Sequence, residues 1–207
     1  SYKLDNFVIS GKLGLEKENI RVRNKKISQV NHPNSLGSPL TNKYITTDFS
    51  ESQIELVTPP FQPPREAHNF LHFLNEFAIK NIDNESLWCS SMPPYIESSD
   101  LIQIAKYGNS NLAAFKETYR RGLSNRYGNL MQTISGVHYN YSFSSDYLGL
   151  FLDHQFDQDG ISKIYFRSLR NLKRINWLIL YLFGASPVAT RNFNLVEKIE
   201  FSEKKDF

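Results

Sequence analysis

Residues 14–22, GLEKENIRV, alternate in a way that is typical of a β-strand but give that strand one unusual face. Because neighbouring side chains of a strand point to opposite faces, Glu16 and Glu18 share a face with Ile20 and Val22. An apolar face normally points to a core, where two carboxylates are costly unless a cation neutralises them. The pattern therefore predicts a strand and raises the question of which cation lies over the two glutamates.

Similar patterns divide the rest of the chain into strands and helices. Residues 53–58 alternate and stop at two prolines, and residues 132–143, QTISGVHYNYSF, alternate strongly. Apolar residues at helical spacing follow the prolines at 63–64 and continue to Ala78. The other expected elements are a short return strand at 27–30 after a turn around Asn24, a loop at 32–42, and helices at 110–123 and 162–182. Because strands and helices interleave, we expect an α+β fold in which helices pack on one face of a sheet.

The composition narrows the classes of function. The 207 residues are enough for one good-sized core or two small ones, and 40% hydrophobic with 22% charged residues is ordinary for a folded soluble protein. The formal net charge is +3 with acids and bases interspersed, so no nucleic-acid surface is expected. The single cysteine, Cys89, excludes an intrachain disulfide and suits a reducing compartment.

Neither a signal peptide nor a membrane span is predicted. The stretch SYKLDNFVISGKLG lacks a basic segment followed by an apolar one. The longest apolar run, Trp177 to Ala189, is too short to span a bilayer and contains Gly184 and Pro187, so we expect it in the core. These features favour a cytoplasmic protein without a membrane partner.

Three groups of acidic or imidazole side chains are candidates for the chemistry. The groups are Glu16 and Glu18; Asp48, Glu51 and Glu55; and His138, Asn140 and Ser142, which share one face of the predicted strand. Mg²⁺ prefers carboxylate oxygens, water and substrate phosphates, so carboxylates on adjacent strands with one histidine suit a nucleotide site with several Mg²⁺ ions. In the alternative interpretation these acids pair with Lys17, Arg21 or Arg23, or face solvent, and the sequence pattern leaves both interpretations open.

Five motifs carry a resemblance to a known family. They are GLEKENIRV, TTDFSESQIELVTPP, SMPPYI, the stretch YGNSNL…HYNYSF at 107–143, and YLFGASP. In this order, from about residue 11 to residue 190, they resemble the N-terminal part of the bacterial glutamate–cysteine ligases, also called γ-glutamylcysteine synthetases. The resemblance implies a glutamine-synthetase-like fold, a curved and mainly antiparallel sheet with helices packed on the outside. Residues 1–207 would form a single N-terminal portion of that catalytic domain, so the sheet would be incomplete.

The resemblance also implies a reaction and a set of site residues. ATP phosphorylates the side-chain carboxylate of glutamate, and the amine of cysteine then displaces phosphate to give γ-glutamylcysteine, the first intermediate of glutathione synthesis. The implied ligands of Mg²⁺, or alternatively Mn²⁺, are Glu16, Glu18, Asp48, Glu55 and His138. The implied substrate residues are Phe49, Tyr119 and Leu123 around the cysteine side chain, Arg120 on a substrate carboxylate in a catalytic role, and Gln132 and Ile134 in the glutamate pocket.

One departure from the family concerns length. Members of the family are much longer, and the part beyond this match would hold further strands, another metal-ligating glutamate and arginines for the ATP phosphates and glutamate. Three explanations are open: an N-terminal piece of a larger protein, one chain of a pair, or a short protein that kept the fold without catalysis. The alternative activity is that of a related carboxylate–amine ligase with another amine acceptor. We expect little or no ligase activity from the isolated chain.

Overall fold

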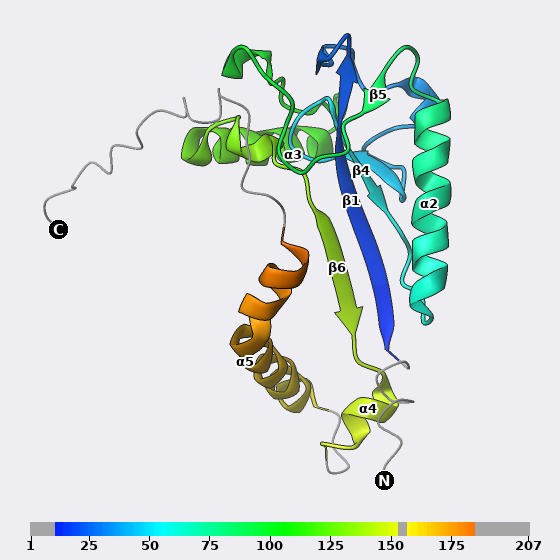
Figure 1. Cartoon of the computed structure of the whole chain (residues 1–207), viewed down its shortest axis with the longest axis vertical. Coiled ribbons are helices and arrows are strands. Elements are labelled where there is room, and N and C mark those ends of the chain that lie inside the picture. Colours follow the sequence, from blue (N-terminus) through cyan, green and yellow to red (C-terminus); the bar gives the residue numbers. More distant parts are fainter. Residues whose placement is uncertain (1–10, 153–156, 185–207) are drawn as a thin grey trace, which may run out of the picture.

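The computed structural model describes residues 11–152 and 157–184, and its centre is one long strand. This strand, β1 (Lys12–Arg23), belongs to a six-stranded sheet in which the pairings are antiparallel. Figure 1 shows β1 in blue between β4 and β6. The predicted α+β fold with an antiparallel sheet is confirmed, and within the described residues the sheet does not close on itself.

The register of the sheet decides which side chains share a face. The other strands are β2 (Lys26–Ile27), β3 (Ile45–Thr47), β4 (Gln53–Val57), β5 (Ser86–Leu87) and β6 (Val137–Ser142). Glu18 lies opposite Glu55 of β4, and Glu16 lies opposite His138 of β6. Because paired residues of neighbouring strands point to the same side, these four side chains lie on one face of the sheet.

Helix α2 (Pro64–Lys80) covers the other face. Pro64 stands in its first turn, where a missing N–H costs nothing, and the helix turns its apolar stripe toward β4. The core on this face consists of Leu36, Ile45, Ile54, Leu56, Leu74, Ala78 and Ile82. Lys17, on the α2 side of β1, donates to the side chain of Asn75 at 3.0 Å and fixes the helix to the strand.

A second core lies on the face that carries the glutamates. Ile20 and Val22 pack there with Phe49, and Leu123 of α3 (Asn111–Tyr127) lies against this cluster. Helices are therefore not confined to one face of the sheet, contrary to the expectation from the sequence pattern. The apolar end of the glutamate-bearing face lies in this second core, while Glu16 lies beyond the core.

The capping of α3 follows from its sequence. The Ser110 hydroxyl accepts from the backbone N–H of Ala113 at 3.2 Å, and the helix ends at Gly128, whose φ of 76° lies in the left-handed region that glycine adopts without strain. Among residues 11–152 and 157–184, the short helices are η1 (Asn34–Leu36), η2 (Ser99–Leu101), η3 (Met131–Thr133) and α4 (Ser145–Gly149).

Two predicted strands are shorter than their sequence patterns indicate. The strand predicted over 132–143 begins only at Val137, because residues 131–133 form η3, in which the Thr133 hydroxyl donates to the Leu130 carbonyl at 2.7 Å. The predicted return strand at 27–30 is limited to β2, and the Val30 carbonyl accepts from the Arg21 guanidinium instead of a strand partner.

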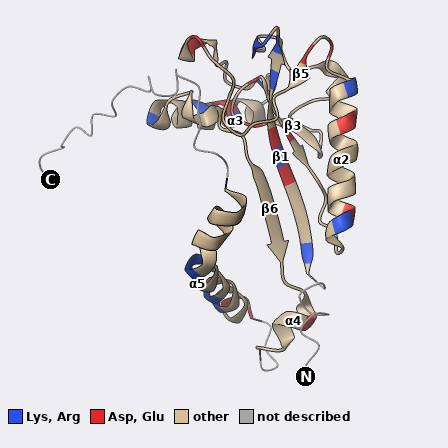
Figure 2. Cartoon of the chain, viewed as in Figure 1, with Lys and Arg blue, Asp and Glu red and all other residues tan. Residues whose placement is uncertain are grey.

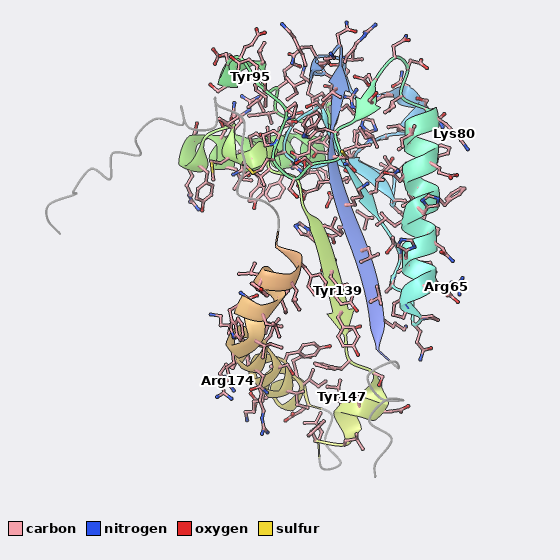
Figure 3. The ribbon with its side chains drawn as sticks, viewed as in Figure 1. Arg65, Lys80, Tyr95, Tyr139, Tyr147 and Arg174 are labelled. Carbon is pink, nitrogen blue, oxygen red and sulfur yellow. The ribbon has the colours of Figure 1, made fainter. Side chains whose placement is uncertain are left out.

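Helix α5 (Gln158–Phe183) starts four residues before the predicted boundary and has no buried residue. The expectation that the run from Trp177 lies in the core is wrong for its described part: Trp177 is 67% exposed and Tyr181 82%, because the described chain packs nothing over them. Figure 3 shows Arg174 on the side of α5 that points away from the sheet. None of the helices in the described residues is long and apolar enough to cross a membrane.

Candidate metal and substrate site

The site lies on the face of β1 opposite α2, where β1, β4 and the β3–β4 turn bring acidic side chains together and β6 adds a histidine. Figure 2 shows acidic positions at mid-length of β1, beside β6. His138 contacts both glutamates of β1: its Nδ1 lies 3.0 Å from a carboxylate oxygen of Glu16, and its Nε2 lies 3.9 Å from one of Glu18. The face that strand alternation predicted for Glu16 and Glu18 is therefore confirmed, and the sheet register adds Glu55 and His138 to it.

Asp48 completes the cluster from the turn between β3 and β4. One carboxylate oxygen from each of Glu18, Asp48 and Glu55 lies within 4.8 Å of the other two. In octahedral Mg²⁺ sites, opposite ligands are separated by about 4.2 Å, twice the metal–oxygen distance. Three carboxylate oxygens at this spacing are a donor set that a hard divalent cation fits, with small side-chain adjustments.

One backbone donor and one side-chain donor hold the two glutamates of β1 in place. The Gly136 N–H donates to Glu18 at 2.9 Å, and the amide of Asn140 donates to Glu16 at 2.9 Å. A Cβ at position 136 would meet Nε2 of His138 at 3.3 Å, so glycine permits this close approach. The sequence pattern placed Asn140 on the face of His138, and the family resemblance gave it no role of its own.

The carboxylates of the cluster lie close together, and burial has the largest effect on their pKa values. Burial raises the pKa of Glu55 to about 7, and the neighbouring Asp48 adds to this effect. Burial likewise raises the pKa of Glu18 and of Asp48, although hydrogen bonds from the Gly136 N–H to Glu18 and the charge of Arg120 near Asp48 oppose it. The hydrogen bond to Glu16 raises the pKa of His138.

No lysine or arginine in the described part of the chain forms an ion pair with Glu18, Asp48 or Glu55. Arg21 is fully buried and pairs with Glu85 at 2.6 Å, at the other end of β1. The alternative interpretation, in which nearby cations pair with these acids, is therefore wrong for this cluster.

Glu51 belongs to the same acidic segment of the sequence but not to the site. It is 4% exposed, and its two carboxylate oxygens accept from the backbone N–H groups of His32 and Lys106, each at 2.7 Å. The sequence pattern alone did not distinguish Glu51, which holds the backbone, from the clustered carboxylates of Glu18, Asp48 and Glu55.

Arg120 of α3 lies beside the acidic cluster and is held by backbone carbonyls. Its Nε donates to the carbonyl of Asp48, and its Nη1 donates to the carbonyl of Lys116 at 3.1 Å. Its guanidinium carbon lies 4.7 Å from the centre of the Tyr107 ring. A guanidinium held in this way is pre-oriented, and its remaining donors can bind a carboxylate.

The other predicted substrate residues are only partly brought together. Phe49 and Leu123 belong to one hydrophobic cluster, where Phe49 is 1% exposed, and Tyr119 lies one turn before Leu123 with 60% of its surface exposed. Gln132 is half-buried in η3, and Ile134, 37% exposed, follows it. The hydrogen bonds of Arg120 within the described residues go to the carbonyls of Thr47, Asp48 and Lys116, and not to Gln132 or Ile134.

An α+β fold with a carboxylate cluster on an antiparallel sheet is the class that the structure defines, and comparison with known sequences gives the family. The sequence model of the family described as glutamate-cysteine ligase matches residues 2–206. The chain belongs to the glutamate–cysteine ligase family. It is 49% identical to the glutamate–cysteine ligase of Wigglesworthia glossinidia brevipalpis over 182 residues, which cover 87% of this chain and 36% of the relative. It is 41% identical to the ligase of Alcanivorax borkumensis over 200 residues, which cover 91% of this chain and 38% of that relative.

Solved structures agree with this assignment. The glutamate–cysteine ligase of Francisella tularensis, in complex with AMP, superposes with a TM-score of 0.82 at 40% identity, over 88% of this chain and 36% of that one. A bifunctional glutathione synthetase from Pasteurella multocida superposes with a TM-score of 0.80 at 30% identity, over 94% of this chain and 26% of that one. The chain thus spans little more than a third of the length of the curated relatives it matches.

Proposed function

We propose that this chain forms the N-terminal part of the active site of an ATP-dependent glutamate–cysteine ligase. In the reaction, the γ-carboxylate of glutamate takes the terminal phosphoryl group of ATP, releasing ADP. The cysteine amine then attacks the acyl carbon, the C–N bond forms, phosphate leaves and the amine loses a proton. The observation that carries this proposal is the cluster of Glu18, Asp48 and Glu55, and the AMP bound to the Francisella tularensis relative supports it.

The chain's own residues take distinct roles in this proposal. Glu16, Glu18, Asp48, Glu55 and His138 would hold Mg²⁺ or Mn²⁺, which supplies neutralisation of the charge that spreads over the transferred phosphoryl group. Neutral imidazole is the form of His138 that binds a metal. Arg120 holds a substrate carboxylate beside this cluster.

The remaining substrate residues define specificity in the proposal. Phe49, Tyr119 and Leu123 line a small apolar slot for the cysteine side chain, in which Phe49 forms the buried base. Gln132 and Ile134 contribute to the glutamate pocket from the segment before β6.

We propose that turnover needs more polypeptide than the 207 residues of this sequence. The curated relatives extend over nearly three times the matched length. We therefore propose that the remaining portion, as a continuation of the chain or as a second polypeptide, supplies the rest of the phosphate-binding and glutamate-binding groups.

The experiment separates metal binding from catalysis. Mn²⁺ binding to the 207-residue chain is measured by electron paramagnetic resonance, which detects the free ion, for the wild type, Glu18→Gln and Glu55→Gln. Glu66→Gln, an exposed acid in the first turn of α2, is the matched control. We expect binding by the wild type and the control, and loss in both site variants.

Catalysis is tested by ATP-dependent phosphate release with glutamate and cysteine, with and without the C-terminal portion of a relative added as a separate polypeptide. Release only in the combined sample, and its loss in Glu55→Gln, supports the proposal. Mn²⁺ binding that is unchanged in Glu18→Gln and Glu55→Gln would contradict the assignment of the cluster.

A further inference from the structure

Tyr107 occupies a buried position between the β3–β4 turn and helix α3. Only 5% of its surface is exposed, and its hydroxyl lies 2.7 Å from the carbonyl oxygen of Thr47 and 3.1 Å from that of Asp48. The phenolic hydrogen is therefore shared between the carbonyl of a proposed metal ligand and that of the residue before it. Burial raises the pKa of Tyr107 to about 12, so the phenol remains a hydrogen-bond donor at neutral pH.

The same ring supports Arg120. The guanidinium carbon lies 4.7 Å from the ring centre, within the range of a cation–π contact. Arg120 also donates through Nε to the Asp48 carbonyl, which is one of the two oxygens that the Tyr107 hydroxyl reaches. One phenol thus contacts both the backbone of Asp48 and the charged group of Arg120.

The segment around Tyr107 is itself fixed. The Ala105 N–H donates to the Phe49 carbonyl at 2.9 Å, and the Lys106 N–H donates to the buried carboxylate of Glu51 at 2.7 Å. Tyr107 therefore cannot move without disturbing the turn that carries Asp48 and Phe49. This arrangement makes the phenol a rigid connection between two parts of the site.

We propose that Tyr107 is a positioning residue that sets the Asp48 carboxylate and the Arg120 guanidinium relative to one another. This inference rests on the proposed function, because it assumes that Asp48 binds a cation and that Arg120 binds a substrate carboxylate. Tyr107 itself would contact neither the cation nor the substrate. Residues that orient metal ligands in this way commonly change metal affinity by about 10-fold when they are replaced.

The test uses the 207-residue chain with Tyr107→Phe, which keeps the ring and removes the hydroxyl, and Tyr107→Leu, which removes both. The control is Tyr95→Phe, because Tyr95 is 55% exposed. Two readouts are taken on folded samples: the dissociation constant for Mn²⁺, and the hydrogen-exchange rate of the Arg120 Nε–H by ¹⁵N NMR, assigned through Arg120→Lys. The second readout does not depend on metal binding.

Tyr107→Phe is expected to weaken Mn²⁺ binding by about 10-fold. The variant is also expected to speed exchange of the Arg120 Nε–H by about fivefold. This factor corresponds to about 1 kcal/mol, the contribution of the hydrogen bond that the Tyr107 hydroxyl makes to the backbone carbonyls. Tyr107→Leu should increase both effects, and Tyr95→Phe should leave both readouts unchanged.

Unchanged exchange of the Arg120 Nε–H in folded Tyr107→Phe would overturn the inference, as would equal effects in Tyr95→Phe. If the wild type binds no Mn²⁺, the metal assignment of the proposed function fails. The Arg120 exchange rate then still decides whether Tyr107 positions the arginine.

Discussion

Glu18 and Glu55 face each other directly across the β1–β4 pair, so two carboxylates occupy one cross-strand position. An oxygen of Asp48 lies within 4.8 Å of an oxygen from each of them. Like charges opposite each other destabilise a sheet, and a divalent cation removes that repulsion. The arrangement thus opposes the stability of the metal-free chain and favours metal binding.

Replacing Glu55 by glutamine should stabilise the metal-free chain at pH 8, where Glu55 is ionised. The expected gain is about 0.5–1 kcal/mol in the free energy of unfolding, since one member of a like-charge pair is removed. Urea denaturation in the presence of a chelator measures it, with Glu66→Gln as the control. A loss of stability in Glu55→Gln would show that the repulsion is not significant.

The stability of the metal-free chain should fall as pH rises from about 4.5 to about 7. The pKa of Glu55 in the folded chain is about 7, above its ordinary value, so the folded state holds this proton more tightly than the unfolded state does. The stabilisation is complete below the ordinary pKa and is lost as pH rises through the folded value. Thermal unfolding across this range, compared with Glu55→Gln, measures the effect, and an equal slope in both proteins would contradict it.

Mg²⁺ should raise the unfolding temperature of the wild type. Saturation to 100 times the dissociation constant adds about 2.7 kcal/mol to the free energy of unfolding. Potassium chloride at the same ionic strength controls for screening, and Glu18→Gln should lose the response. A rise of the same size in potassium chloride would indicate a general salt effect.

Arg21→Met should destabilise the chain by about 3–5 kcal/mol, because it leaves the Glu85 carboxylate buried without its partner. The double variant Arg21→Met with Glu85→Gln should recover part of this loss. Urea denaturation of the single and double variants gives the coupling energy. An additive loss in the double variant would show that the pair is not coupled.

The apolar slot proposed for cysteine should accept 2-aminobutyrate, in which a methyl group replaces the thiol. We expect kcat/KM within about 10–200-fold of that for cysteine in the sample completed with the C-terminal portion, since an apolar slot discriminates only modestly between such groups. Serine should be rejected more strongly. Equal rejection of 2-aminobutyrate and serine would contradict the roles of Phe49, Tyr119 and Leu123.

Strand periodicity predicted much of the site because its geometry is fixed. Alternation placed Glu16 and Glu18 on one side of their strand, and His138 with Asn140 on one side of theirs. Antiparallel pairing of the two strands then put both pairs on the same face of the sheet. The role of Asp48 came from the resemblance to the ligase family, because a side chain in a turn has no period. The same limit applies to Glu51, which has identical chemistry but binds backbone N–H groups.

The failed predictions concern contacts that a local pattern does not contain. The apolar run beginning at Trp177 has the composition of a core segment, yet its described part is exposed, because a local pattern does not determine which segments pack over it. Residues 132–136 alternate like a strand, but the hydroxyl of Thr133 bonds to the backbone and forms η3 instead. Tyr107 was missed because no motif marks an aromatic ring between two binding groups.

The single strand β1 supplies glutamates to one side of the sheet and Lys17 to the other. A shift of the β1–β4 register by one residue would point Glu16 and Glu18 into the hydrophobic core beneath α2. Leu15 would then lie on the opposite face of the sheet, where the glutamates now lie. A chain paired in this slipped register would lose both its hydrophobic core and its cluster of carboxylates. The register between β1 and β4 therefore determines both the hydrophobic core under α2 and the positions of the clustered carboxylates.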